Sequence, residues 1–386
     1  MKIQRIFYIS ATGILALGCT SCSEADEPAG AASADEYILF GRPWINPDAT
    51  VGDFASRATL ATEVQEFDVW GYCVPRSVSN ANQLNQSGAP LDWNRKCNFF
   101  TGTPDVFDKV RVTNSGDFTN YKTASIQLRQ WNANDEARYT FIATSVHDTD
   151  LFSMSYSSAT SGDAHGPRLT FTLPAEGSSL TTQLDYTAQP DALIAARFDH
   201  QKADGRVPMS FAHMMIGLRF KFHNHTDDKD LIVKRVTFSG EFYKQTVVDF
   251  SSDDPDFTVT DRTYSGVFTL LDSPQTIIAG AADLMGTTTH PVTLLLLPNR
   301  HPVLSTDDAH DKELVLGNRK TITIEYSIGG NEQTYTLNNF ELNYIPQENS
   351  LHTAHFNFVG DQFVVMFQAN NDTQWGNGSD TEVDIK

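Results

Sequence analysis

Two cysteines near the amino terminus are placed for covalent attachment of lipid. Cys19 follows Gly18 and an apolar stretch, and Cys22 follows Ser21. A small residue directly before cysteine is what bacterial lipoprotein processing reads, so either thiol is a candidate for acylation. An acidic tract after Cys22, residues 23–27, resembles the export signal of some surface-exposed lipoproteins. We therefore expect lipidation at Cys22, with Cys19 as the alternative.

The remaining cysteines are Cys73 and Cys97. In an oxidising compartment they could form one disulfide, or both could be small buried thiols, and the sequence leaves both possibilities open. Two cysteines are too few for a disulfide framework. They also lack the Cys-x-x-Cys spacing typical of zinc and redox sites.

Two pairs of histidines have spacings that bear on metal binding. His223 and His225 project to one face of a strand, but the sequence shows no third ligand beside them. His352 and His355 would point to opposite sides of a strand. The sequence also lacks a Gly-x-Ser-x-Gly elbow, a phosphate-binding loop and a dinucleotide-binding glycine pattern. We therefore expect no metal, no cofactor and no enzymatic activity.

The first residues predict export. Lys2 and Arg5 precede a mostly apolar stretch, residues 6–17, which is the pattern of a secretory signal peptide. The stretch is shorter than the roughly 20 apolar residues that span a hydrocarbon core. A lipid on cysteine can hold a protein at a membrane without a transmembrane helix. The alternative is an ordinary signal peptide in which the two cysteines are incidental.

Length and charge limit the function classes. Of 386 residues, removal of the signal leaves roughly 360, enough for two domains at about 100–200 residues each. The formal net charge is -20. Because an acidic surface repels phosphate backbones, we expect no nucleic-acid partner.

Alternating apolar and polar residues predict an all-β fold. Residues 67–72 form a strand with aromatics on both faces, and residues 212–222 form the clearest strand, with Ala212, Met214 and Ile216 on one face. Residues 231–238 form the next strand, although Lys234 interrupts its apolar face. Further predicted strands are residues 125–131, 139–143, 292–297, 355–359 and 363–367, and a hairpin covers residues 321–338. Short strands with few helices favour β-sandwiches with antiparallel sheets.

Composition divides the chain into four parts. Residues 1–22 form the signal peptide, and residues 23–57 contain a flexible tether and one strand, residues 37–45. The least strand-like composition of the middle lies at residues 187–208. We place a domain boundary there, near Asp204, which gives an N-terminal β-sandwich over residues 58–204 and a C-terminal one over residues 205–386.

Three stretches resemble the fimbrillin family, the Mfa-like subunits of type V pili. The first is residues 56–59, in which Arg57 precedes Ala58, followed by the aromatic strand 67–72. The second is residues 209–220, which look like the Phe-x-His strand of the carboxy-terminal half. The third runs from residue 349 through residues 363–367 to Trp375. The match at residues 344–350 is distant, so the sequence leaves the role of stalk, anchor or tip open.

The resemblance implies two transthyretin-like β-sandwiches and a lipoprotein on the outer surface of the cell. By analogy with the family, a protease cuts between Arg57 and Ala58, and the strand at residues 37–45 departs. A strand of another subunit then fills the open sheet position. We expect the incoming strand to be residues 363–367, with Phe363, Val365 and Phe367 as its assembly residues. The terminal strand could equally belong to the sheet of its own domain.

The expected partners follow from this resemblance. They are other copies or related pilus subunits, the outer membrane through the N-terminal lipid, and a host or bacterial surface ligand that supports cell adhesion. The alternative is a monomeric outer-surface lipoprotein that binds glycans, with exposed Trp70, Trp93 or Trp131 as stacking platforms. Only the pilus interpretation requires cleavage at Arg57.

Overall fold

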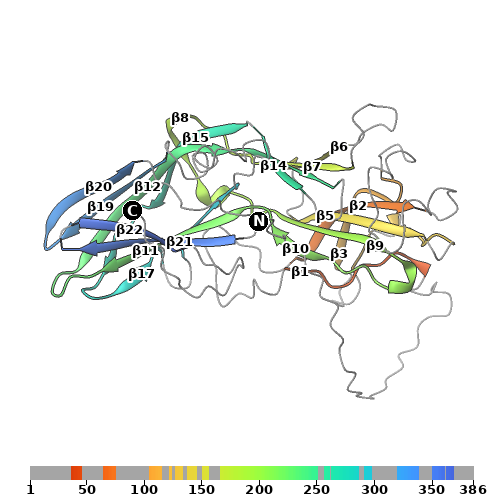
Figure 1. The fold of residues 1–386 in the computed structure, drawn as a ribbon, viewed down its shortest axis with the longest axis horizontal. Coiled ribbons are helices and arrows are strands. Elements are labelled where there is room, and N and C mark those ends of the chain that lie inside the picture. Colours follow the sequence, from red (N-terminus) through yellow and green to blue (C-terminus); the bar gives the residue numbers. More distant parts are fainter. Residues whose placement is uncertain are drawn as a thin grey trace, which may run out of the picture.

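The computed structural model describes residues 36–45, 64–74, 104–114, 121–123, 127–133, 137–145, 150–155, 166–250, 256–260, 262–286, 291–297, 320–338, 350–360 and 362–368. These residues form β-strands and two short 3-10 helices, η4 (Tyr186–Ala188) and η5 (Lys202–Asp204). The predicted all-β fold is confirmed. The molecule is elongated, and sheets lie at both of its ends (Figure 1). None of the helices in the described part is long and apolar enough to cross a membrane.

A seven-stranded sheet occupies one end of the molecule (Figure 1). Its pairs are antiparallel, except that the edge strand β1 runs parallel to β10. In spatial order the strands are β1 (Trp44–Ile45), β10 (Ser210–His213), β9 (Leu193–His200), β5 (Arg138–Ser145), β2 (Glu66–Val74), β3 (Phe107–Asn114) and β4 (Tyr121–Thr123).

A five-stranded and a six-stranded sheet form the other end (Figure 1). The five-stranded sheet contains β17 (Ala282–Leu284), β11 (Ile216–Asn224), β21 (Ser350–Val359) and β22 (Gln362–Gln368), with β18 (Thr293–Leu296) beside β11. The six-stranded sheet contains β20 (Asn331–Asn338), β19 (Thr321–Ile328), β12 (Leu231–Tyr243), β15 (Thr263–Leu271) and β8 (Ser178–Leu184), with β16 (Gln275–Ile277) beside β12.

A four-stranded sheet combines strands from both halves of the sequence. Its order is β14 (Asp256–Val259), β13 (Gln245–Asp249), β7 (Arg168–Thr172) and β6 (Phe152–Ser155). In the same way, β8 pairs with β15, and β10 pairs with β9. Hydrogen-bonded sheets therefore extend across position 204 in both directions. The division into domains at Asp204 stays a prediction.

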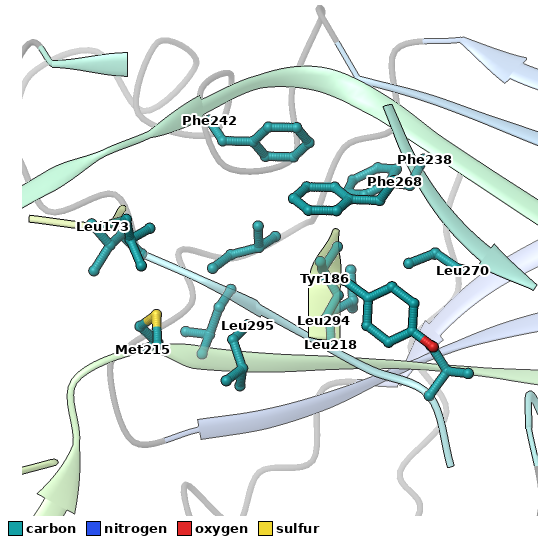
Figure 2. Close-up of a cluster of buried hydrophobic side chains, with 14 of the residues drawn as sticks. Leu173, Tyr186, Met215, Leu218, Phe238, Phe242, Phe268, Leu270, Leu294 and Leu295 are labelled. Atoms are coloured by element: carbon teal, nitrogen blue, oxygen red, sulfur yellow. The ribbon is translucent and has the colours of Figure 1, made fainter. Parts of the chain in front are cut away.

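The aromatic residues of β2 serve two separate cores. Phe67 and Val69 lie in one buried cluster, whereas Trp70 and Tyr72 lie in the other. The second cluster continues into the far end, where Phe238, Phe242 and Phe268 face leucines of β11 and β18 (Figure 2). The seven-stranded sheet is thus apolar on both faces, as the predicted strand at residues 67–72 required.

The strand predicted at residues 212–222 is in fact two strands. The chain leaves β10 at His213 and enters β11 at Ile216, so it passes from the seven-stranded to the five-stranded sheet. Met214 and Met215 at the break are both fully buried. Because the apolar alternation continues through the break, the sequence pattern could not predict the change of sheet.

Lys234 does not interrupt the apolar face of β12. The register of β12 against β19 shifts between Val233 and Arg235, which is the signature of a β-bulge. The buried residues therefore change from odd to even positions, from Val233 to Val236, while Ile232 is only partly buried. Lys234 points outward and forms an ion pair with Glu332 of β20. We predicted Ile232, Val236 and Phe238 on one face interrupted by Lys234; Val236 and Phe238 are buried as predicted, whereas the placement of Ile232 on that face was wrong because of the bulge.

The predicted hairpin is confirmed as β19 and β20. All eight residues of β19 pair in order with β20, and the turn residues Gly329 and Gly330 have φ values of 55° and 82°. Only glycine adopts two successive positive φ values without steric cost, and such turns match the twist of paired strands. The closing strands were also predicted correctly and correspond to β21 and β22.

A glycine allows β8 to approach β15 closely. A Cβ atom on Gly266 would lie 2.4 Å from the Leu184 side chain and 2.7 Å from the Thr182 carbonyl oxygen. We predict that Gly266→Ala lowers the free energy of unfolding by about 1–3 kcal/mol, because overpacking forces neighbouring atoms to move. Denaturant unfolding measures this loss. Gly41→Ala is the matched control, since its Cβ would meet only the Val207 carbonyl oxygen at 3.7 Å. Equal losses in both variants would contradict the close approach.

Candidate assembly groove

The leading segment, residues 36–45, lies between residues 129–131 and residues 207–211 beside the seven-stranded sheet, and we call this strand position the groove. The sequence predicted it as a separate strand. In the structure its backbone is hydrogen-bonded to other segments of the chain on two sides. On one side, the Ile38 amide donates to the Arg129 carbonyl at 2.9 Å, and the Trp131 amide donates to the Glu36 carbonyl at 3.0 Å. An antiparallel bridge joins Tyr37 to Gln130.

On its other side, the leading segment runs parallel to residues 207–211. The Val207 amide donates to the Leu39 carbonyl, and the Gly41 amide donates to the Val207 carbonyl, both at 2.9 Å. The Trp44 amide then reaches the Met209 carbonyl at 3.2 Å. Beyond it, β1 continues the ladder, with Ile45 opposite Phe211. We call this stretch of residues 207–211 the acceptor edge.

Alternate side chains of the leading segment enter the core. Ile38 and Phe40 are fully buried, while Tyr37 and Leu39 are only partly covered. The Phe40 ring packs edge-on against Phe67 and Phe141, with centroid distances of 5.4 and 5.6 Å, and lies 6.1 Å from Phe107. Burying a side chain of this size stabilises a fold by roughly 1.5–3 kcal/mol. The leading segment is therefore part of the core.

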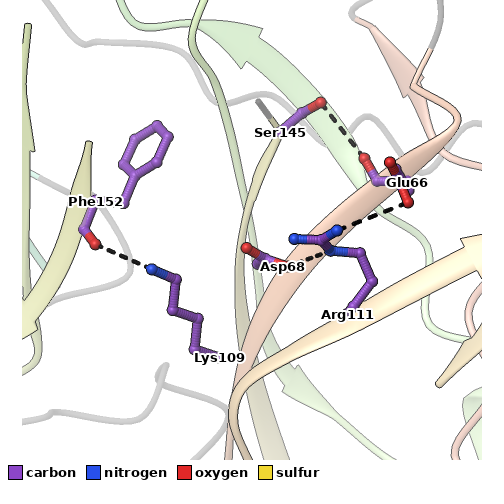
Figure 3. Close-up of polar contacts among 6 residues, drawn as sticks. All are labelled: Glu66, Asp68, Lys109, Arg111, Ser145 and Phe152. Atoms are coloured by element: carbon purple, nitrogen blue, oxygen red, sulfur yellow. Dashed lines mark hydrogen bonds and ion pairs between the residues drawn. The ribbon is translucent and has the colours of Figure 1, made fainter. Parts of the chain in front are cut away.

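Ion pairs and hydrogen bonds hold the strands that carry Phe67 and Phe107. Arg111 of β3 donates from Nε to Oδ1 of Asp68 on β2 at 2.8 Å, and its Nη1 lies 4.0 Å from Glu66 Oε2 (Figure 3). Lys109 reaches from β3 to the Phe152 carbonyl of β6 at 3.5 Å (Figure 3). Asp68 is buried, so its pairing with Arg111 satisfies a carboxylate that would otherwise be costly in this position.

His200 holds the turn that leads into the acceptor edge. Its ring is fully buried, and Nε2 lies 3.0 Å from the Gly205 carbonyl oxygen. The turn between His200 and Gly205 is η5, in which the Asp204 carboxylate accepts a hydrogen bond from the backbone amide of Gln201 at 2.9 Å. Burial lowers the pKa of His200, so the neutral ring is favoured, and Nε2–H donates to the carbonyl. Val207 lies two residues after Gly205, and its backbone amide and carbonyl are hydrogen-bonded to the leading segment.

Trp131 closes the groove near the start of the leading segment. Its ring stacks edge-on against Tyr139 at 4.9 Å and lies 5.8 Å from the His200 ring. Trp131 and Trp70 have exposed fractions of only 9% and 2%. They are core residues and cannot serve as exposed stacking platforms for sugars. Trp93 lies outside the described residues.

The predicted processing and lipidation residues lie outside the described part of the chain. These are Cys19, Cys22, Arg57 and Ala58. Cys73 lies in β2, buried in the same cluster as Phe40, and its amide donates to Asp105 Oδ1 at 2.8 Å. Its predicted partner Cys97 lies outside the described residues. The disulfide therefore stays a prediction.

The predicted assembly strand is an edge strand of its own sheet. β22 pairs with β21 over seven residues, with Val365 opposite Phe356 and Phe367 opposite Ala354. The Phe363 ring is buried between Tyr326 and Phe358, at 4.9 and 5.1 Å. β22 lies toward one end of the molecule, and the leading segment lies toward the other (Figure 1). The structure thus does not bring the two predicted assembly elements together within one chain.

Sequence reasoning missed the residues that form the groove. It located residues 37–45 but did not identify Phe107, Phe141 and His200 as their neighbours. Ile38 and Phe40 are two residues apart, a spacing that predicts one buried face of a strand. No local pattern predicts that Phe107 and Phe141 lie beside them, because strand pairing between distant segments brings these residues together.

Comparisons with known proteins give structural likenesses only. No family model and no curated protein matches the chain. A solved structure of a candidate cell adhesion protein from Bacteroides uniformis covers 88% of this chain and 97% of its own, with 11% identity and a TM-score of 0.42. A fimbrial assembly protein from Parabacteroides distasonis covers 90% and 97%, with 10% identity and a TM-score of 0.34.

The tip fimbrial protein Mfa3 from Porphyromonas gingivalis, truncated at its C-terminus, is also similar. It covers 86% of this chain and 98% of its own, with 8% identity and a TM-score of 0.36. The descriptions of these three structures name a candidate cell adhesion protein, a fimbrial assembly protein and a tip fimbrial protein. At such identities and TM-scores the likeness does not assign the chain to a family.

The buried aromatic ring of the leading segment can be tested directly. We predict that Phe40→Ala lowers the free energy of unfolding by about 3–5 kcal/mol, as expected when a packed aromatic side chain leaves a cavity. Trp44→Ala is the control in the same segment, because Trp44 is 43% exposed and should cost much less. Equilibrium unfolding of both variants measures the difference. A Phe40→Ala protein as stable as the Trp44→Ala protein would show that the segment contributes little to the core.

Proposed function

We propose that this protein is a structural or accessory subunit of a surface filament, a fimbria, which supports cell adhesion. The proposal rests on one observation about the leading segment: Ile38 and Phe40 are fully buried, and its backbone is hydrogen-bonded on two sides. A core element that precedes a predicted cleavage point can be removed from the folded protein. Its removal would leave a vacant strand position in the sheet.

A vacant position of this kind favours assembly. Loss of the leading segment would uncover Phe67, Phe107 and Phe141 and would leave the Val207 amide without its acceptor, the Leu39 carbonyl. Exposed edge groups beside an apolar groove invite pairing with an extended strand. Main-chain hydrogen bonds then supply affinity, and alternate side chains supply register. The open groove is therefore a binding site for another subunit.

We propose that proteolysis after Arg57 opens the groove and that a terminal strand of another copy or a related subunit enters it. The candidate donor is β22, with Phe363, Val365 and Phe367. Its edge position means that it can leave without breaking a second ladder in the described part of its sheet. Because the groove and β22 lie toward opposite ends of the molecule, insertion would proceed head to tail and extend into a filament (Figure 1).

In this proposal the uncut protein is held at the outer membrane by lipid on Cys22 or Cys19. Proteolysis after Arg57 would then separate the lipid from the assembling subunit. Assembly of this kind requires no catalytic activity of the chain. The alternative, a monomeric glycan-binding lipoprotein, receives no support from Trp70 and Trp131, since both are buried.

We predict that Arg57→Ala leaves the protein folded but abolishes processing and polymerisation in cells. The wild-type protein should begin at Ala58 by amino-terminal sequencing and give ladders on a non-boiled gel. The Arg57→Ala protein should retain the leading segment and migrate as a single species, because its groove stays filled.

Arg42→Ala is a suitable control, since Arg42 is an exposed arginine within the leading segment. This variant should still be cut after Arg57 and should still form ladders. Ladders from Arg57→Ala, or mature wild-type material that retains residues 37–45, would refute the mechanism.

A further inference from the structure

A buried histidine ties the turn before the acceptor edge to the core beneath the groove. His200 is the last residue of β9, its ring is fully buried, and its Nε2 lies 3.0 Å from the Gly205 carbonyl oxygen. Only Arg206 separates Gly205 from Val207, which bonds the leading segment through both its amide and its carbonyl. The His200 ring therefore fixes the turn two residues before the hydrogen bonds that keep the groove filled.

The pocket of the His200 ring does not accommodate a second ring proton. Its Nδ1 is buried and has no hydrogen-bond partner among the described residues. The rings of Trp131 and Phe141 lie 5.8 and 6.4 Å from the imidazole, measured between centroids. A proton on Nδ1 would therefore place a charge among apolar rings, which is costly in a buried position. Trp131 also belongs to the groove, because its amide donates to the Glu36 carbonyl.

The charged groups around the ring do not offset its burial. The Asp204 carboxylate lies 3.7 Å from Nδ1 and favours a protonated ring, but its side chain is 45% exposed and already accepts from the Gln201 amide. Arg197, on the same strand, disfavours a second positive charge. Tyr139 lies opposite His200 on β5, and burial raises its pKa, so it stays neutral. Burial is the largest of these effects and lowers the pKa of His200.

A lowered pKa makes the turn sensitive to mild acid. A solvated imidazole has a pKa of about 6.5, so below that pH a ring that has left the pocket binds a proton, whereas the buried ring does not. Protons therefore favour the open turn as the pH falls through about 6.5, and the effect levels off only below the lowered pKa of the buried ring. At higher pH neither ring is charged, and the turn keeps its full stability.

We propose that His200 is a pH-sensitive switch of the groove, which holds the acceptor edge while its ring is neutral and releases it when its ring is protonated. Protonation draws the ring toward solvent and breaks its bond to Gly205, so that Val207 can separate from Leu39. Mild acid thereby loosens the strand that fills the groove. For the leading segment this follows from its contacts alone, whereas for an incoming strand it rests on the proposed function.

Hydrogen exchange at the Val207 amide of the uncut full chain, at pH 7.5 and pH 5.5, tests the switch. The quantity to compare is the protection factor, the intrinsic exchange rate at each pH divided by the observed rate. We expect it to fall about three- to tenfold at pH 5.5. Tenfold is roughly the limit for one imidazole that has a pKa of about 6.5 in solvent and stays neutral in its pocket. The Phe238 amide of β12 should change less.

His200→Gln is the decisive variant, because a glutamine amide nitrogen can replace Nε2 as donor to Gly205 and does not titrate. In this variant the Val207 protection factor should be the same at both pH values. His225→Gln is the matched control, since it removes an exposed histidine directly after β11, and it should keep the wild-type response. An unchanged protection factor in the wild-type protein, or an equal fall in folded His200→Gln, would overturn the proposal.

Nitrogen NMR of wild-type protein labelled with ¹⁵N-histidine gives a test that does not depend on the folding of a variant. At pH 6.5 a solvated imidazole is about half charged, whereas the His200 ring should be mostly neutral, with its proton on Nε2. A His200 ring that is at least half charged at this pH would also overturn the switch.

These measurements use the uncut chain, so they depend neither on cleavage nor on assembly. Ladders from Arg57→Ala would count against the proposed function alone. Protection of Val207 that does not respond to pH would count against the switch alone.

Discussion

The fold at the amino-terminal end depends on the burial of Phe40 in a pocket of three phenylalanines. Phe67, Phe107 and Phe141 come from β2, β3 and β5, and the ring of Phe40 contacts all three strands. Aromatic pairs of this geometry contribute about 0.5–1.5 kcal/mol each beyond the area that they bury. The ring therefore joins neighbouring strands through contacts that no ladder hydrogen bond provides.

Phe40 belongs to the leading segment, which precedes the predicted cleavage point in the sequence. Residues 36–45 combine buried side chains with hydrogen bonds to Arg129 on one side and Val207 on the other. His200 positions the acceptor edge through the turn at Gly205, independently of the leading segment. The edge would consequently stay in place for a second strand after the first one leaves. A preformed edge also lowers the entropy cost of binding, since the receptor side is already ordered.

Local patterns predicted those elements whose partners are close in sequence. The hairpin of β19 and β20 followed from alternation and from Gly329 and Gly330, because the turn alone sets its register. The two faces of β2 followed from its aromatics. By contrast, the bulge at Lys234 and the change of sheet at Met214 and Met215 depend on tertiary pairing. Alternation of apolar and polar residues predicts which residues are buried, but it does not predict the sheet to which they belong.

The candidate sites show the same limit. The sequence located residues 37–45, but their pocket needed Phe107 and Phe141 from two other strands. It also identified His223 and His225, but His355 joined them only through a parallel pairing of distant strands. Residues whose chemistry depends on non-local contacts carry no local signal. The expectations of processing at Arg57 and of lipidation at Cys19 or Cys22 rest on local sequence alone and stay predictions, since these residues lie outside the described part of the chain.

Hydrogen exchange at the Val207 amide tests the central account most directly, because its acceptor is the Leu39 carbonyl of the leading segment. Exchange should be slow in the uncut protein, fast in protein that is cut after Arg57 and kept monomeric, and slow again in filaments. The Phe238 amide, in the middle of β12, should stay slow in all three samples. Slow exchange at Val207 in the cut monomer after loss of residues 36–45, or fast exchange in filaments, would contradict the account.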